Sequence, residues 1–310
     1  MDRLDAMTVY AAIVDAGSLS AAARRLNTPL ATVSRKLAEL EAHLGTRLIT
    51  RSTRKLVLTD AGRDYLVACR QILEQVEEAE QAAAGAYAQV RGQLVIAAPI
   101  VFGRLHVVPV VAAFLELHPE VDVQLRLGDR NVHLIEEHID LALRIGALPD
   151  SNLVATQLGT IRRVVCASPA YLARFGTPAT PDELVAHRCI SFDGLEAASA
   201  WTFTDQAGEK RQVVVRSRLT VSTADAALAA ACLGLGLTRV LSYQAAEALR
   251  AGQLVRVLTE AEPPAVPVSL IYPGQGRLPM KTRAFIDFAV GRLRERLTTP
   301  EGARFNPASP

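Results

Sequence analysis

The stretch SAAARRLNTPLATVSRKLAELE, from Ser20 to Glu41, decides the fold of the first part of the chain. Its alanines are small enough to let helices approach closely, and the break at Asn27 and Thr28 predicts a tight turn, with Thr28 as cap and Pro29 at the first position of the next helix. Apolar residues then recur at helical spacing, at Val33, Leu37, Leu40 and Leu44. The stretch therefore predicts two short helices, the second with one buried face and one face free to contact something else.

Glycine and serine set the limits of the neighbouring helices. An apolar stripe predicts a first helix over residues 4–16, which Gly17 ends, and the Ser18 hydroxyl then caps a second helix that runs to residue 26. The third helix, which follows the turn, ends at Gly45. Short helices joined in this way predict a helix-turn-helix unit.

The free face of the third helix carries polar and basic side chains near its N-terminal end. A recognition helix presents side chains to base edges at this end, where its dipole also favours a phosphate. Together with two serines that precede it, the residues expected at DNA are Ser18, Ser20, Pro29, Leu30, Thr32, Ser34, Arg35 and Lys36.

A basic hairpin is expected directly after the third helix. Two short apolar runs, residues 47–49 and 56–58, predict a two-stranded wing. Residues 20–58 hold eight basic and two acidic side chains, whereas the whole chain has a formal charge of +2. Such a local excess is typical of a module that binds a polyanion, although a three-helix packing unit with a solvated hairpin is the alternative. The wing adds three expected DNA contacts: Arg51, Arg54 and Lys55.

A long helix is predicted from Thr59 to about residue 86, because this segment has no proline and its only glycines lie near the ends. Apolar residues alternate spacings of four and three, which is a heptad seam and indicates a helix pair between two subunits. The alternative is a seam that packs on the second domain of the same chain. The residues expected to dimerise are Tyr65, Cys69, Ile72, Val76, Ala79 and Ala83.

After Gly92 the sequence alternates short apolar runs with helical stretches, which predicts parallel sheets with covered faces. Strands are expected at 93–97, 121–127, 141–145, 162–167, 237–241 and 268–272, and helices at 106–118, 132–138, 169–175, 224–233, 242–251 and 280–297. If the strands form two sheets, the chain crosses between them near residues 160–163 and 263–268, and the expected fold is an α/β domain of two Rossmann-like lobes.

Ligands of such sheets bind at the carboxyl ends of the strands. The residues expected to line a cleft there are Pro99, Ile100, Val101, Phe102, Asp129, Arg144, Ile145, Gly146, Ala167, Ser168, Trp201, Ser222, Thr223 and Thr238. Ser222 and Thr223 precede a helix start and suit an anionic group, or they simply cap that helix. Arg144 is suited to a carboxylate or to a structural ion pair, and Trp201 to the cleft or to a core.

The chain lacks the motifs of common enzymes and metal sites. We find no phosphate loop, no H-E-x-x-H, no C-x-x-C and no G-x-S-x-G, so neither catalysis nor a cofactor nor a metal is expected. The N-terminus has no apolar signal and no run of 18 apolar residues occurs, so a cytoplasmic protein without membrane contact is expected.

The segments GSLSAAARRL and TVSRKLAELEAHLGTRLITRSTRKLVLTDAG resemble the N-terminal domain of LysR-type transcriptional regulators. The resemblance implies that Ser34 and Arg35 match the Ser-Arg pair of the recognition helix and that Arg51 and Arg54 match the wing arginines, while Leu30 departs from a position that is often polar. It implies a winged helix-turn-helix domain (1–59), a linker helix (60–88), an effector domain (89–298; lobe I 89–161 and 268–298, lobe II 162–267) and a disordered tail (299–310).

The same resemblance implies an operator of double-stranded DNA, a small-molecule effector between the lobes, contact with RNA polymerase, and a homodimer or homotetramer. Two other functions stay open at this point. One is a free-standing small-molecule binding protein, and the other is a regulator that senses oxidants through its cysteines, with Cys166 and Cys189 in the second lobe.

Overall fold

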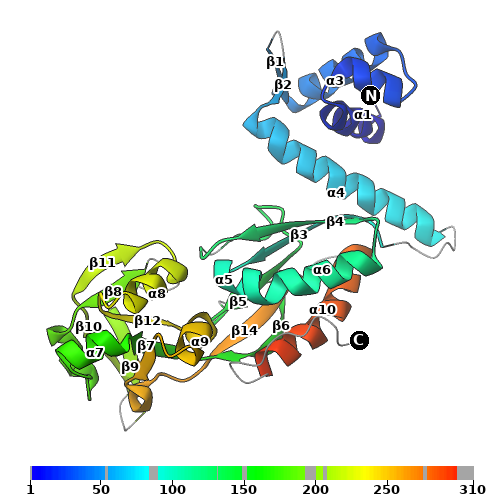
Figure 1. Cartoon of the computed structure of the whole chain (residues 1–310). Helices are drawn as coiled ribbons and strands as arrows, with labels where there is room; N and C mark the ends of the chain where they lie inside the picture. The colour runs from blue at the N-terminus through cyan, green and yellow to red at the C-terminus, as the bar shows by residue number, and fades with distance from the viewer. Residues whose placement is uncertain are drawn as a thin grey trace. The chain divides into compact units, whose positions relative to one another are not determined.

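The computed structural model describes residues 2–52, 55–83, 90–130, 132–148, 152–192, 200–204, 208–274 and 278–298. The chain divides into two compact units, Met1–Gly92 and Gln93–Pro310 (Figure 1). The expected tail at 299–310 lies outside the described residues.

The first unit, called the head, begins with three helices whose ends follow from their caps. Its elements are α1 (Arg3–Ala16), α2 (Leu19–Arg25), α3 (Leu30–Leu44), β1 (Ile49–Ser52), β2 (Lys55–Leu58) and α4 (Asp60–Ala83). Gly17 and Gly45 end α1 and α3 in the left-handed conformation, and the Ser18 hydroxyl accepts from the Ala21 amide, as predicted. Pro29 lies one position earlier than predicted, at the N-cap of α3, and the Thr28 hydroxyl donates to the Leu26 carbonyl instead of capping.

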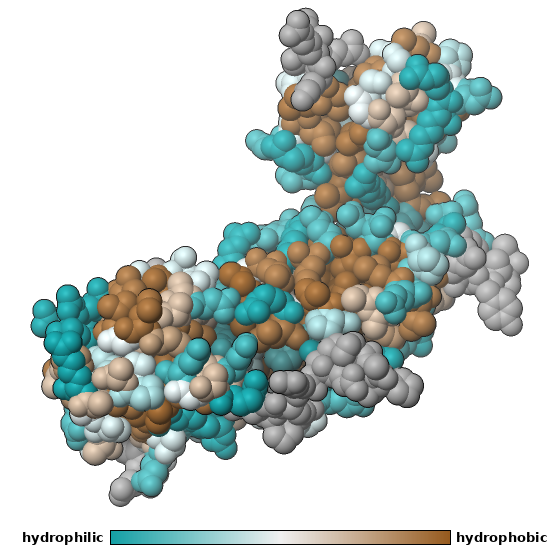
Figure 2. Space-filling model, in the orientation of Figure 1, coloured by the Kyte–Doolittle hydropathy of each residue, from teal (hydrophilic) through white to brown (hydrophobic). Residues whose placement is uncertain are grey.

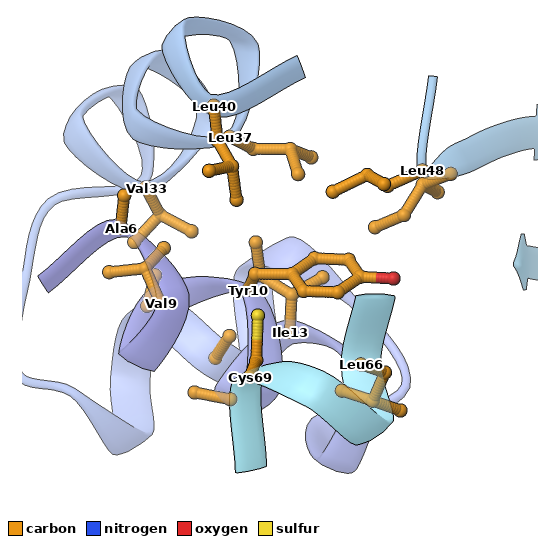
Figure 3. Packing of buried hydrophobic residues seen from close by; sticks show 14 residues of the cluster. Ala6, Val9, Tyr10, Ile13, Val33, Leu37, Leu40, Leu48, Leu66 and Cys69 are labelled. Carbon is orange, nitrogen blue, oxygen red and sulfur yellow. The ribbon is translucent and has the colours of Figure 1, made fainter. Parts of the chain in front are cut away.

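Apolar residues of all four helices pack into one hydrophobic core in the head. Figure 3 shows Tyr10 and Ile13 of α1 facing Leu37 and Leu40 of α3, with Cys69 of α4 beneath them. The Tyr10 hydroxyl donates to the Gly62 carbonyl at 2.8 Å, so the buried phenol is satisfied by α4. Helix α4 therefore contributes to the core of the head and also carries the chain out of it.

The wing is fixed to α3 by a carboxylate. Glu41, the last residue of the quoted stretch, accepts hydrogen bonds from the amides of Leu48 (2.8 Å) and Ile49 (3.1 Å). At the same end of the hairpin, Thr59 caps α4 by accepting from the Gly62 amide and donates to the Arg47 carbonyl. The antiparallel pair of β1 and β2 is thus held at its base, where Ile49 pairs with Leu58.

The first turns of α4 pack inside the head rather than on an exposed seam. Cys69 is fully buried, and Tyr65 lies against Tyr10 with ring centroids 5.9 Å apart. Burial raises the pKa of the Cys69 thiol to about 11. Farther along, Ile72 and Ala79 are exposed and Val76 is half-buried, while the Ala83 side chain lies outside the described residues. The part of the predicted seam that the head leaves uncovered therefore starts after Cys69.

Lobe I of the second unit is a five-stranded sheet in the order β4-β3-β5-β14-β6. Its strands are β3 (Gly92–Ala98), β4 (Val121–Leu127), β5 (Leu141–Ile145), β6 (Leu153–Ile161) and β14 (Val266–Pro273), and its helices are α5 (Ile100–Phe102), a π-turn (Gly103–Val107), α6 (Val108–Leu117) and α10 (Met280–Thr298). Helices α6 and α10 lie together beside the sheet, where the rings of Phe114 and Phe285 meet edge to face at 5.1 Å (Figure 1).

Lobe II repeats the plan with the order β11-β8-β12-β7-β13. Its strands are β7 (Arg163–Ala167), β8 (Cys189–Phe192), β11 (Ser217–Val221), β12 (Leu237–Leu241) and β13 (Val255–Val257), with the separate hairpin β9 (Ala200–Thr204) and β10 (Lys210–Val214). Its helices are α7 (Pro169–Phe175), η2 (Pro181–Ala186), α8 (Ala224–Cys232), α9 (Ser242–Arg250) and η3 (Thr259–Ala261). The chain crosses between lobes from β6 to β7 and from β13 to β14, as predicted.

Three expectations about the lobes need correction. The sheets are mixed rather than parallel, because β14 runs antiparallel to β5 and β6, and β7 runs antiparallel to β12 and β13. Residues 132–138 form turns rather than a helix. The helix expected from residue 106 begins at Ile100.

The lobes share a contact along the π-turn. His106 packs against Phe102 of lobe I and Tyr243 of lobe II, with ring centroids 4.7 and 5.5 Å away. Both ring nitrogens of His106 are buried without a hydrogen-bond partner among the described residues. Burial, with a smaller contribution from the nearby Arg296 charge, lowers the pKa of His106 to about 4.

We expect this histidine to make the effector domain less stable in acid. Its pKa is lower in the folded chain than the unfolded value of about 6.5, so its contribution is intact above that pH and is lost as pH falls toward 4. Urea unfolding followed by the fluorescence of Trp201, the only tryptophan, measures the effect. Between pH 6.5 and 4, the free energy of unfolding of the wild type should fall relative to that of His106→Leu. If the difference between the two free energies stays constant with pH, His106 is not the group responsible.

The helix Ile100–Leu117 is predominantly apolar. Its mean hydropathy of 1.8 over 18 residues meets the length and composition of a membrane span. Here it packs against α10, with Phe114 and Val110 buried. The core of lobe I thus accounts for part of this apolar sequence.

Candidate nucleic-acid interface and ligand pocket

The exposed face of α3 presents a mixed surface. Leu30 is 48% exposed, Thr32 and Ser34 are half-buried, and Arg35 is exposed and paired with Glu39 at 3.6 Å. Ser20 and Pro29 are exposed beside them. Because an exposed pair of this kind is weak, the Arg35 guanidinium is available to an external partner.

Lys36 is paired within the head. Its ammonium lies 2.5 Å from the Asp5 carboxylate of α1, and its side chain is 24% exposed. The pair joins α3 to α1 inside the head. The DNA contact expected of Lys36 stays a prediction, which a variant of this residue tests.

Part of the wing lies outside the described residues. Arg51 and Lys55 lie in the two strands, but their side chains, and the whole of Arg54, are not described. Exposed arginines that the sequence assigned to no role, Arg24, Arg25 and Arg47, belong to the same basic segment. The only sequence signal for these arginines as DNA-contact candidates is their contribution to the basic charge of residues 20–58.

A cavity of about 120 Å³ opens at the carboxyl ends of β3, β4 and β5. It brings together four of the residues predicted for a cleft: Pro99, Asp129, Arg144 and Ile145. Its remaining lining combines apolar side chains with Arg126, Arg130 and Glu137. The position agrees with the rule that open α/β sheets bind ligands beyond the ends of their strands.

The charges of this pocket are arranged around the partly buried guanidinium groups of Arg126 and Arg144 and the exposed one of Arg130. Arg144 donates to the Val132 carbonyl at 2.7 Å, and burial lowers its pKa. Arg126 donates to the Glu137 carbonyl, and Arg130 pairs with the Glu137 carboxylate at 3.1 Å. Asp129 accepts from the Ile100 amide at 3.0 Å and so occupies the first free donor of the helix that starts there. A half-buried arginine in a small pocket is suited to an anionic ligand group.

The other expected cleft residues serve mainly to build the lobes. Ala167 and Trp201 lie in the core of lobe II, Thr238 is buried and donates to the Ile190 carbonyl, and Ser168 caps α7. Thr223 caps α8 and Ser222 is exposed. Gly146 follows β5 in the left-handed region, while Val101 and Phe102 are buried at the contact between lobes.

A second cavity, of about 420 Å³, lies in lobe II and was not foreseen from the sequence. It is lined by Asp182 and Arg211, which form an ion pair at 2.5 Å, and by residues of η3. Leu258 at its edge adopts φ +57°, a conformation rare for a bulky residue. No sequence pattern marks this cavity, because its walls come from four distant segments.

The thiols of lobe II are poorly suited to redox chemistry. Burial raises the pKa of Cys166 and of Cys189 to about 12, and that of Cys232 is raised too. Since the thiolate is the reactive form, these environments disfavour oxidation. Among the described residues, no cluster of three or more His, Cys, Asp or Glu is placed to hold a metal ion.

Comparison with known proteins agrees with both parts of this geometry. Residues 4–63 match the family described as bacterial regulatory helix-turn-helix protein, lysR family, and residues 88–294 match the LysR substrate binding domain. A transcriptional regulator of Xanthomonas campestris pv. campestris is 37% identical over 92% of this chain and 84% of its own length.

Solved structures of full-length regulators are similar over nearly the whole chain. The LysR-type regulator CrgA of Neisseria meningitidis is 30% identical, with a TM-score of 0.60 over 93% of this chain and 98% of its own. The virulence activator AphB of Vibrio cholerae is 28% identical, with the same TM-score and the same coverages.

Proposed function

Because the chain belongs to the LysR family of transcriptional regulators, we propose that α3 and the wing read an operator while a small organic anion in the lobe I pocket controls the output. The observation that carries the DNA-reading role is the exposed face of α3 with Arg35 beside the basic wing. A free-standing binding protein would not need this head, and the raised pKa values of the thiols disfavour an oxidant sensor.

Salt dependence tests the DNA-binding role. The probe is a duplex selected from a random pool by the wild-type protein, and the measurement is fluorescence anisotropy at increasing salt. Each phosphate contact adds about −0.9 to the slope of log affinity against log salt, so we expect a steep negative slope. A flat slope, or no selection of any duplex, would favour a free-standing binding protein.

The pocket supports a small carboxylate as the effector class. Its volume of about 120 Å³ is below the roughly 300 Å³ at which drug-sized sites begin, and Arg144 supplies a partly desolvated cation. We expect benzoate or acetate to raise the melting temperature of the wild type, because a ligand at about 100 times its Kd adds about 2.7 kcal/mol.

Matched controls separate the effect of the ligand's negative charge, and of the Arg144 cation, from the effect of the ligand's shape. Benzamide has the shape of benzoate without its charge, and Arg144→Met removes the cation, so neither benzamide with wild type nor benzoate with this variant should give the shift. Equal shifts from benzoate and benzamide would contradict an anion site. No shift from any carboxylate would exclude this effector class.

A homo-oligomer is the expected assembly. Figure 2 shows apolar side chains gathered over α6, where Val108 is 44% and Leu117 62% exposed. Leu233, which follows α8 in lobe II, is 82% exposed. These faces and the uncovered part of α4 are the surfaces we propose for a dimer or tetramer. Analytical ultracentrifugation distinguishes the two assemblies.

The proposal also includes contact with RNA polymerase, a cytoplasmic location and a role without catalysis.

A further inference from the structure

The pocket of lobe I is built against the start of one helix. Asp129 at the pocket rim holds the Ile100 amide, and Gly128 donates to the Ala98 carbonyl at 3.0 Å. A Cβ on Gly103 would lie 2.2 Å from the Leu127 side chain, so the helix runs in close contact with the pocket wall. A group that enters the pocket therefore lies beside Pro99, the N-cap of this helix, and Asp129, which holds its first amide.

The same turn also contacts lobe II. Val101 lies in the core cluster of lobe II, and the Phe102 ring meets Tyr243 edge to face at 5.6 Å. Arg104 pairs with Asp225 of α8 at 3.4 Å. Three successive parts of one turn thus touch the second lobe by apolar, aromatic and ionic contacts.

A π-turn lets the start of this helix contact both the pocket wall of lobe I and the core of lobe II. The Val108 amide donates to the Gly103 carbonyl five residues back, and Pro109 has no amide to donate to the Leu105 carbonyl four residues back. Arg296 of α10 donates to that carbonyl at 2.8 Å instead. The wider turn leaves Leu105 and His106 on lobe II while Val107 and Phe114 are buried in lobe I.

We propose that the π-turn Gly103–Val107 is a joint that couples the lobe I pocket to lobe II, with Tyr243 as the residue that positions the pocket rim from the opposite lobe. The proposal rests on the pocket being the effector site proposed above and adds its regulation. A ligand that displaces Asp129 from the Ile100 amide moves the turn, and Phe102, His106 and Arg104 pass the change to Tyr243 and Asp225. A coupling of this kind is reciprocal, so lobe II must also influence the pocket.

Amide hydrogen exchange of the full-length protein, without DNA or ligand, tests both directions. Tyr243→Ala removes the ring, whereas Tyr243→Phe keeps it and serves as the matched control. We expect Tyr243→Ala to speed exchange of amides 100–107 by about tenfold or more, with Tyr243→Phe and the β5 amides unchanged. From the pocket side, Asp129→Ala removes the acceptor of the Ile100 amide and should speed exchange in the first turn of α9 in lobe II, which a purely local packing role of Asp129 would leave unchanged.

The outcomes separate clearly. If Asp129→Ala changes exchange only in its own lobe, or if Tyr243→Ala leaves amides 100–107 as protected as in wild type, the joint does not exist. If Tyr243→Ala unfolds lobe II, seen as a change in Trp201 fluorescence, Arg104→Gln breaks the ion pair on an exposed side chain and takes its place in the test. Because neither DNA nor ligand enters the measurement, failure of the carboxylate screen or of the DNA assay does not decide it.

Discussion

Arg35→Ala is expected to weaken binding to the selected duplex by about 1–3 kcal/mol, or roughly 5- to 150-fold, the range of a bidentate contact to a base. The side chain is 68% exposed, and its pair with Glu39 lies on the surface of α3, so its loss costs the fold little. Anisotropy at physiological salt measures the affinity, and thermal melting confirms that the variant is folded. Unchanged affinity would remove Arg35 from the interface.

Lys36→Met is the matched control for that experiment. The ammonium of Lys36 pairs with Asp5 within the head, so its removal should not change the salt slope, while loss of a phosphate contact would reduce the slope by about 0.9. Asp5→Asn breaks the same pair from the other side and should have the same small effect. A reduced slope with Lys36→Met alone would return Lys36 to the DNA surface.

Local patterns predicted the head well because its elements are set by nearby residues. The left-handed glycines at 17 and 45 and the cap at Ser18 act within one turn of the helices that they limit. The direction of a long side chain is different, since periodicity places Lys36 near the outer face but does not show that Asp5 reaches it. Glu41 likewise reaches wing amides seven and eight residues away, a contact that no helical pattern encodes.

The effector domain was less predictable because its contacts are distant in the sequence. Strand β6 alternates little and exposes much of its length, so it lacks the apolar run that marks a buried strand. Its antiparallel pairing with β14 joins segments that are separated by the whole of lobe II. The π-turn depends on Pro109, which the sequence shows, and on Arg296 of α10, which only the fold brings near. Trp201 lies in a core that includes the hairpin β9–β10, which periodicity did not detect.

Gly62→Ala is expected to destabilise the head severely, by more than about 3 kcal/mol, as overpacking against fixed backbone does at its upper range. A Cβ at this position would lie 2.1 Å from the Leu48 carbonyl oxygen and 2.9 Å from its carbon, and both are backbone atoms that cannot rotate away. The Gly62 carbonyl also accepts from Tyr10, so any shift of α4 leaves a buried phenol unsatisfied. Limited proteolysis of the head and binding to the selected duplex should both report the loss.

Gly291→Ala in α10 makes the same chemical change in a helix with open space around it. Among the described residues, no atom beyond the backbone of its own helix and its chain neighbours lies within 4 Å of its Cβ position, so this variant should gain about 0.5–1 kcal/mol from helix propensity. We therefore expect Gly62→Ala to lower the free energy of unfolding and Gly291→Ala to raise it. This difference would show that the close approach of α4 to the Leu48 carbonyl, rather than the loss of a glycine as such, determines how the wing is held against the long helix. If Gly62→Ala melts and binds DNA like wild type, α4 is able to move away from that carbonyl without loss, and the head does not depend on it.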